Sequence, residues 1–119
     1  MVEEYKFQKL QVYQIALAYV DAVYDLSRLL PEREKYNLVS QIERASTSIV
    51  LNIAEGSTGQ SDAEQNRFLG LALRSYLETI ACFDLIERRA YIAVEGLSAI
   101  RDQGHQLFIK LSAFRKSVR

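Results

Sequence analysis

Apolar residues in the first quarter of the chain recur every three or four positions, which is the spacing of one face of an α-helix. Two such rows run side by side, so the apolar arc is wider than one core contact requires. We therefore predict a helix from Phe7 to Leu30 that is either central or in contact with another subunit. Pro31 ends it, because proline lacks a backbone N–H donor. The rows are Leu10, Tyr13, Leu17, Val20 and Tyr24, and Val12, Ala16, Tyr19, Val23, Leu26 and Leu30.

A second helical pattern runs from about Glu34 to Glu55 and is followed by Gly56, which we interpret as a left-handed helix cap. After a short stretch of turn-forming residues, Ser61 and Glu64 have the spacing of a capping box. In that motif each of the two side chains bonds a backbone N–H at the start of a helix. The third helix is therefore expected to begin near Asp62.

The third helix has a heptad-like apolar seam that continues to a turn predicted at residues 88–91. From about Val94 another seam repeats every three or four residues, and Gly104 is the gap in it, which predicts one point of close backbone approach. No alternating pattern favours a strand. Four helices with short links pack most simply as an antiparallel up-and-down four-helix bundle, an all-α fold, and residues 1–119 are expected to form a single domain.

Composition limits where such a protein can work. Its single cysteine, Cys82, cannot form an internal disulfide, which fits a reducing compartment. No stretch reaches the ~20 apolar residues that a bilayer requires. The charges at residues 3–9 do not follow the pattern of a secretion signal. We therefore expect a cytoplasmic protein with no membrane partner.

Acidic and basic side chains balance, with 15 of each, but they are unevenly distributed. Residues 65–119 hold nine bases and five acids, whereas residues 1–64 hold six bases and ten acids. Phosphate contact requires clustered lysine and arginine, and the second half offers two modest clusters. The alternative is that these charges are solvated faces. The candidate nucleic-acid-binding residues are Arg67, Arg74, Arg88, Arg89, Arg101, Lys110, Arg115, Lys116 and Arg119.

Catalytic chemistry finds little support in the sequence. Asp102 and His105 lie three positions apart on one helix, but a di-iron site would require a second histidine that the chain lacks. Cys82 lies in an apolar run and is interpreted as a packing residue. No glycine-rich loop is followed by the lysine of a phosphate site. We predict no enzyme, no metal, no cofactor and no small-molecule substrate, and an enzyme would have to carry a bound metal or cofactor when purified.

Two polar rows are expected on neighbouring helices. Ser48, Asn52 and Glu55 share one helical face, and Ser75 and Glu78 share another. One interpretation is a hydrogen-bond network that fixes the helix register, since half-buried polar groups require partners. A carboxylate acid–base pair and a partner-binding surface are the alternatives.

The same polar residues belong to a longer motif. The run Ser-Ile-Val-Leu-Asn-Ile-Ala-Glu-Gly at residues 48–56, followed by Ser75-x-x-Glu78, resembles bacterial four-helix-bundle proteins encoded in intervening sequences of 23S ribosomal RNA genes. The resemblance covers nearly the whole chain. The motif positions that we expect to be structural are Ser48, Asn52, Glu55, Gly56, Ser75 and Glu78.

This resemblance implies a homopentamer without enzymatic activity. A protein of similar fold, the accessory protein of diversity-generating retroelements, is a positively charged pentamer that binds a reverse transcriptase and nucleic acid. RNA or a reverse-transcriptase-like protein is therefore the implied partner. Our hypothesis is a homo-oligomeric bundle that binds RNA, or a protein that does, through its basic second half. The alternative is a structural protein–protein scaffold that binds no nucleic acid.

Overall fold

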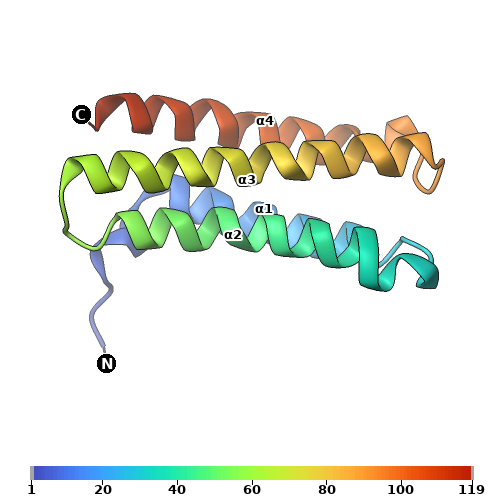
Figure 1. Cartoon of the computed structure of the whole chain (residues 1–119), viewed down its shortest axis with the longest axis horizontal. Coiled ribbons are helices and arrows are strands. Elements are labelled where there is room, and N and C mark those ends of the chain that lie inside the picture. The colour runs from blue at the N-terminus through green and yellow to red at the C-terminus, as the bar shows by residue number, and fades with distance from the viewer. Residues whose placement is uncertain (1, 119) are drawn as a thin grey trace.

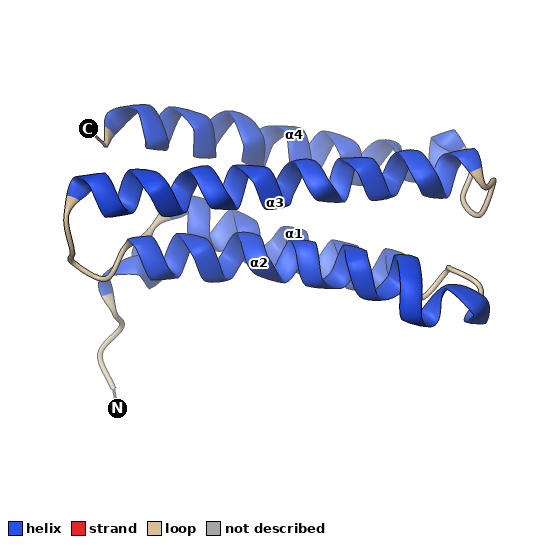
Figure 2. Ribbon diagram, in the orientation of Figure 1, coloured by secondary structure: helices blue, strands red, loops and turns tan. Residues whose placement is uncertain are grey.

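Four long helices run alternately up and down in the computed structural model, which describes residues 2–118 (Figure 1). Each helix packs against those next to it in order, and the last closes on the first. Helices make up nearly all of the ribbon in Figure 2, and no strand occurs within the described residues. The predicted all-α antiparallel four-helix bundle is confirmed. The helices are α1 (Gln11–Ser27), α2 (Ser40–Gly56), α3 (Asp62–Arg88) and α4 (Val94–Ser117).

The bundle has two distinct ends, and its longest extent is 43 Å. We call the first the loop end. It holds the α2–α3 loop (residues 57–61), the start of α1 and the end of α4, at the left of Figure 1. We call the second the connector end. It holds the α1–α2 connector (residues 28–39) and the α3–α4 turn (residues 89–93), at the right of Figure 1.

α1 is shorter at both ends than the predicted helix from Phe7 to Leu30. Phe7 lies in a separate 3₁₀ turn (Lys6–Lys9), because Leu10 has an extended backbone (φ −69°, ψ 132°) that interrupts the helix. At the other end, Leu30 precedes Pro31, whose ring disfavours helical dihedrals in the residue before it. Leu30 is nevertheless buried, so the apolar pattern predicted its packing but not its conformation.

The two apolar rows of α1 have different surroundings. The row that contains Ala16, Tyr19 and Val23 is buried in the bundle core. The other row is only half covered, and Leu17 and Tyr24 in it keep 36% and 40% of their surface exposed. The apolar arc is therefore wider than the core of one bundle covers.

Gly56 is not a left-handed cap, and that prediction is wrong. It is the last residue of α2 and is buried, while the left-handed backbone lies three residues later at Gly59 (φ 91°). A Cβ on Gly56 would lie 2.7 Å from the Cβ of Phe68. The glycine therefore lets α2 and α3 approach each other closely, and these two helices share the largest helix–helix contact.

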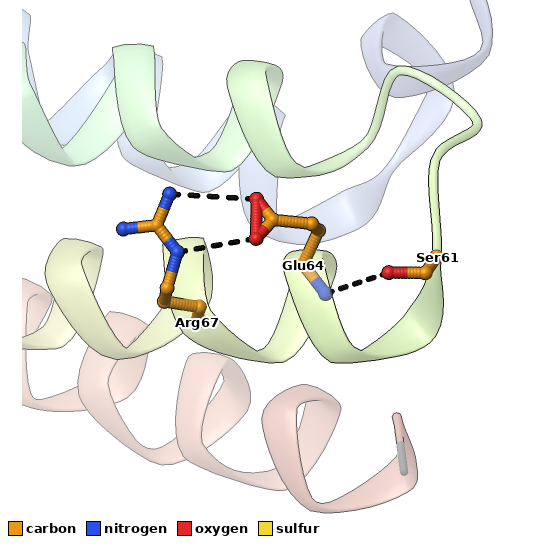
Figure 3. A network of polar contacts seen from close by, with 3 residues as sticks. All are labelled: Ser61, Glu64 and Arg67. Carbon is orange, nitrogen blue, oxygen red and sulfur yellow. Dashed lines mark hydrogen bonds and ion pairs between the residues drawn. The ribbon is translucent and has the colours of Figure 1, made fainter.

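Only half of the predicted capping box forms at the start of α3. The Ser61 hydroxyl accepts a hydrogen bond from the backbone N–H of Glu64 (3.1 Å), so α3 begins at Asp62 as expected. The Glu64 carboxylate does not return to Ser61. It binds the guanidinium of Arg67 instead, as Figure 3 shows.

Gly104 lies against aromatic side chains at the centre of the core. A Cβ there would meet the rings of Tyr19 and Tyr76, each at 2.9 Å. The predicted close approach is therefore real, but it involves side chains and not a second backbone. The Tyr19 hydroxyl is bonded to Thr79 Oγ1 (2.7 Å), and Thr79 donates to the Tyr76 carbonyl (2.6 Å). Burial raises the pKa of Tyr19, so the hydroxyl stays neutral.

The α3–α4 turn forms where it was predicted and has the hydrogen bonds of a Schellman motif. The N–H of Ala90 donates to the Glu87 carbonyl (3.0 Å), and the N–H of Tyr91 donates to the Ile86 carbonyl (3.1 Å). Ala90 adopts the left-handed conformation (φ 58°) that glycine usually supplies at this position. The turn therefore retains some backbone strain.

Candidate nucleic-acid interface

The basic candidates do not form one cluster. Arg88 and Arg89 lie at the connector end, where α3 stops, whereas Arg115 and Lys116 lie in the last turn of α4 at the loop end. The two groups are therefore separated by most of the length of the bundle. Arg119 lies outside the described residues.

Two candidates are held in ion pairs within the bundle. Arg67 pairs with Glu64 (Nε to Oε1, 3.3 Å) and its guanidinium carbon lies 4.4 Å from the centroid of the Phe68 ring. Arg101 bridges from α4 to α3, with its terminal nitrogen 3.1 Å from the carboxylate of Asp84. These partners reduce the charge that either arginine offers to a phosphate.

Arg115 has a structural contact that the sequence pattern did not reveal. Its Nε donates to the backbone carbonyl of Asn66 (3.1 Å), and the Asn66 amide donates to the carbonyls of Arg115 (3.2 Å) and Val118 (2.9 Å). Gly70 makes room for the guanidinium, since a Cβ there would lie 2.7 Å from its terminal nitrogen. Arg115 therefore fastens the end of α4 to α3.

The remaining candidates are exposed. Arg88 and Arg89 have no ion-pair or hydrogen-bond partner for their side chains among residues 2–118, and the same holds for Arg74 and Lys110 within that range. Of these four, Arg88 and Arg89 alone are adjacent. They are the candidates best placed to contact a polyanion, because an uncompensated cation can replace the counterions of a phosphate.

The structure brings part of the polar motif together. Ser75 of α3 donates to the Ser48 hydroxyl of α2 (2.9 Å), and the Asn52 amide donates to the Ser48 hydroxyl (3.0 Å) and carbonyl (2.9 Å). Glu55 and Glu78 are exposed and take no part in this network. The three inner side chains bond to one another across two helices, and the two carboxylates remain available to solvent.

A buried carboxylate at the connector end was not among the predicted site residues. Glu34 is 9% exposed and accepts hydrogen bonds from the Tyr91 hydroxyl (2.7 Å) and the Asn37 amide (3.0 Å). It also accepts a longer bond from the N–H of Leu38 (3.4 Å). The bond from Tyr91 is the main reason why the pKa of Glu34 lies below its usual range. The guanidinium carbon of Arg33 lies over the Tyr91 ring, 5.7 Å from its centroid.

Two exposed tyrosines toward the connector end were also missed as site residues. Tyr24 of α1 and Tyr36 of the connector line an open groove together with Lys35 and Arg44. Tyr36 has 88% of its surface exposed. Adjacent aromatic and basic residues at 35–36 are the signal that could have identified it, because such pairs are common in single-strand binding surfaces.

Other candidate chemistry has no geometric support within the described residues. Cys82 is buried, and that burial raises the pKa of its thiol, which keeps it in the unreactive neutral form. No three histidine, cysteine or acidic side chains in residues 2–118 are grouped as metal ligands would be. None of the described helices has the length and apolar character needed to cross a bilayer.

Comparison with known proteins agrees with this architecture. The family described as 23S rRNA-intervening sequence protein matches residues 8–113. The crystal structure of a protein of unknown function from the S23 ribosomal protein family of Bacteroides thetaiotaomicron superposes with a TM-score of 0.80. It shares 28% sequence identity, and the match covers 88% of this chain and 98% of that one. Among curated proteins none matches. Because the family match extends over most of the chain, this protein belongs to the 23S rRNA-intervening sequence protein family.

Proposed function

We propose that this chain is a cytoplasmic, non-enzymatic, single-domain protein that assembles with copies of itself and binds RNA through the connector end of the bundle. The observation that carries the RNA part is the adjacent pair Arg88 and Arg89, both exposed and without partners among residues 2–118. Because ion pairs occupy Arg67 and Arg101, and Arg115 is fastened to α3, this pair is the strongest remaining cationic feature.

The self-assembly part rests on the half-covered row of α1. Leu17 is 36% exposed, and Leu51 of the neighbouring α2 is 61% exposed. The bonds from Tyr24 to Thr47 (3.5 Å) and from Ser27 to Glu43 (2.7 Å) set the antiparallel register, which places Leu51 level with Val20. A second copy would cover this apolar strip.

A ring of identical subunits would also strengthen RNA binding. Two arginines alone contact few phosphates, but a closed ring repeats the pair around its axis, and multivalency raises the affinity without any new type of contact. We propose a pentamer, the assembly that the family resemblance implies. The alternative partner is a reverse-transcriptase-like protein that itself carries the RNA.

The proposal is tested by fluorescence anisotropy with a labelled structured RNA at low and at physiological salt. We expect saturable binding that weakens steeply with salt, and a clear loss of affinity in Arg88→Ala/Arg89→Ala. The matched control is Lys6→Ala/Lys9→Ala, which removes the same charge at the loop end and should bind nearly as well as the wild type. Absence of binding even at low salt would refute RNA binding.

A structural protein–protein scaffold is the second candidate. It is favoured by the internal use of Arg67, Arg101 and Arg115, which weakens the electrostatic case, and by the exposed leucines of α1 and α2. The same titration separates the two functions. A scaffold would show an oligomeric mass in solution together with no RNA binding at any salt concentration.

A further inference from the structure

The groove beside the connector is lined by two tyrosines, of which the bundle leaves Tyr36 uncovered. Tyr24 is 40% exposed and Tyr36 is 88% exposed, and both line the groove between the end of α1 and the start of α2. Burying a tyrosine ring contributes substantially to folding, so a ring that remains almost fully exposed gives the fold little stability. The Tyr36 ring is therefore available to a ligand with flat apolar faces.

Cations accompany the rings. The Lys35 ammonium lies 5.5 Å from the centroid of the Tyr36 ring. Arg44 reaches the same groove from the first turn of α2, where its guanidinium donates to the Ser40 hydroxyl (3.2 Å). Both cations are exposed. A polyanion in the groove would meet two positive charges beside its aromatic floor.

Two of the acids in this region, Glu43 as one of the groove-lining residues and Glu34 beside the groove, are engaged in hydrogen bonds. The Glu43 carboxylate accepts a hydrogen bond from Ser27 (2.7 Å), and Glu34 accepts one from Tyr91 (2.7 Å). The Tyr91–Glu34 bond holds the connector against the α3–α4 turn, whereas the Ser27–Glu43 bond joins α1 to α2. The cations of the connector, which include Arg33, remain on the outside. Exposed Glu32 is the acid that opposes them here. The outer surface of the connector is consequently more basic than its sequence suggests.

The groove and the Arg88–Arg89 pair lie at the same end of the molecule (Figure 1). The Tyr91–Glu34 hydrogen bond and the stacking of Arg33 on Tyr91 join the α1–α2 connector to the α3–α4 turn. The groove and the turn are therefore parts of one connected end of the bundle.

We propose that a single-stranded RNA occupies the connector end, with an unpaired base stacked on Tyr36 and with phosphates beside Lys35, Arg44 and the Arg88–Arg89 pair. Aromatic side chains stack on unpaired bases but cannot reach bases that are paired inside a duplex. The ligand is thus a single strand and not a double helix. This inference rests on the RNA binding proposed above and adds the groove to the site.

The test is anisotropy titration of the full chain with a labelled oligouridine long enough to span the groove and the turn, and with a blunt RNA duplex of equal length. Tyr36→Ala should weaken oligouridine binding roughly tenfold or more, which is the usual effect of removing one stacking ring. Tyr36→Phe keeps the ring and should bind like the wild type. Binding of the duplex should not change in either variant.

Tyr5→Ala is the matched control, because Tyr5 is also an exposed tyrosine (65%) but lies near the loop end. Its binding of oligouridine should equal that of the wild type. The melting temperature of Tyr36→Ala should also stay unchanged, since the ring is nearly fully exposed.

Each contrary outcome identifies what fails. If Tyr36→Ala binds oligouridine like the wild type while Arg88→Ala/Arg89→Ala weakens that binding, the groove is not part of the RNA site and the proposed function stands. If the wild type binds neither RNA, both proposals fail. If Tyr36→Ala lowers the mass of the assembly and no RNA binds, a second copy of the chain occupies the groove instead.

Discussion

Glu34 and Tyr91 show how one residue pair joins segments that are 57 positions apart. The tyrosine hydroxyl donates to a carboxylate that also caps the turn at the start of the second helical segment. Because the bond favours the charged form of Glu34, it lowers the pKa of this group in the folded protein relative to the unfolded chain. The resulting stabilisation is present above the unfolded-state pKa of the carboxyl and is lost as the pH falls through the folded-state pKa.

Tyr91→Phe should therefore raise the pKa of Glu34 toward its ordinary value and lower the stability at neutral pH. NMR titration of the Glu34 side-chain carboxyl measures the first effect, and melting curves across the acid range measure the second. The difference in melting temperature between variant and wild type should shrink as the pH falls through the acid range, because Glu34 is then protonated in both proteins. A difference that stays constant down to the lowest pH would contradict this account.

Ala90 is the residue at which the backbone is strained. A non-glycine residue in the left-handed region costs roughly 1 kcal/mol, and Ala90 holds φ 58° in the Schellman turn after α3. Ala90→Gly should therefore stabilise the protein by about 1 kcal/mol in urea unfolding. Ala81→Gly, at an exposed position inside α3, should destabilise the protein by a similar amount, because glycine is unfavourable in a helix interior. If both substitutions lowered the free energy of unfolding equally, backbone strain at Ala90 would be ruled out.

At the scale of elements, α2 and α3 form the tightest helix pair because small residues lie between them. Gly56 of α2 faces Phe68 of α3, and Ser48 meets Ser75 farther along the same contact. Small side chains let the helix axes approach, and the half-buried serine hydroxyls satisfy each other across the contact. At the centre of the bundle, by contrast, a glycine makes room for large rings, because Gly104 lies against Tyr19 and Tyr76.

Gly56→Ala should destabilise the bundle by roughly 1 to 3 kcal/mol, because the new Cβ would overlap the Cβ of Phe68 and one helix has to shift. Gly70→Ala is the matched control. Its Cβ would meet the guanidinium of Arg115, the end of a flexible side chain that can move aside with the loss of its hydrogen bond to the Asn66 carbonyl. The control should change stability by less than about 1 kcal/mol, because alanine also favours the helix. Urea unfolding of both variants measures the contrast.

Periodicity and helix-terminal residues predicted the four helices, the start of α3 and the turn before α4, because those signals are local. The role of Gly56 was missed, since a glycine at a helix end looks the same in sequence whether it caps the helix or contacts another. The contact of Arg115 with Asn66 joins residues 49 positions apart and has no local signature. The exposure of Tyr36 likewise depends on how the connector packs, so the groove was visible only in three dimensions.

For the whole molecule, the main question is what covers the apolar strip along α1 and α2. A specific interface buries about 800 Å² on each partner, which is roughly a tenth of the 7452 Å² surface of this chain. Leu17 and Leu51 alone supply less than that. The half-buried residues Tyr13 and Val20 add apolar area along the same strip, and the polar side chains that border it have to supply the rest of such a contact.

Leu51→Glu should therefore disrupt self-association without unfolding the chain, because Leu51 contributes little to the core when 61% of its surface is exposed. Light scattering coupled to size exclusion should show the mass falling toward the 13.6 kDa of one chain, while circular dichroism stays helical. Gln14→Glu adds the same charge to the exposed polar face of α1 and should keep the wild-type mass.

The melting temperature of the wild type, but not that of Leu51→Glu, should then rise with protein concentration, since assembly stabilises the folded state by mass action. A variant that keeps the wild-type mass would place the subunit contact on another face of the bundle, where the exposed Leu77 and Ile109 of α3 and α4 become the next positions to change.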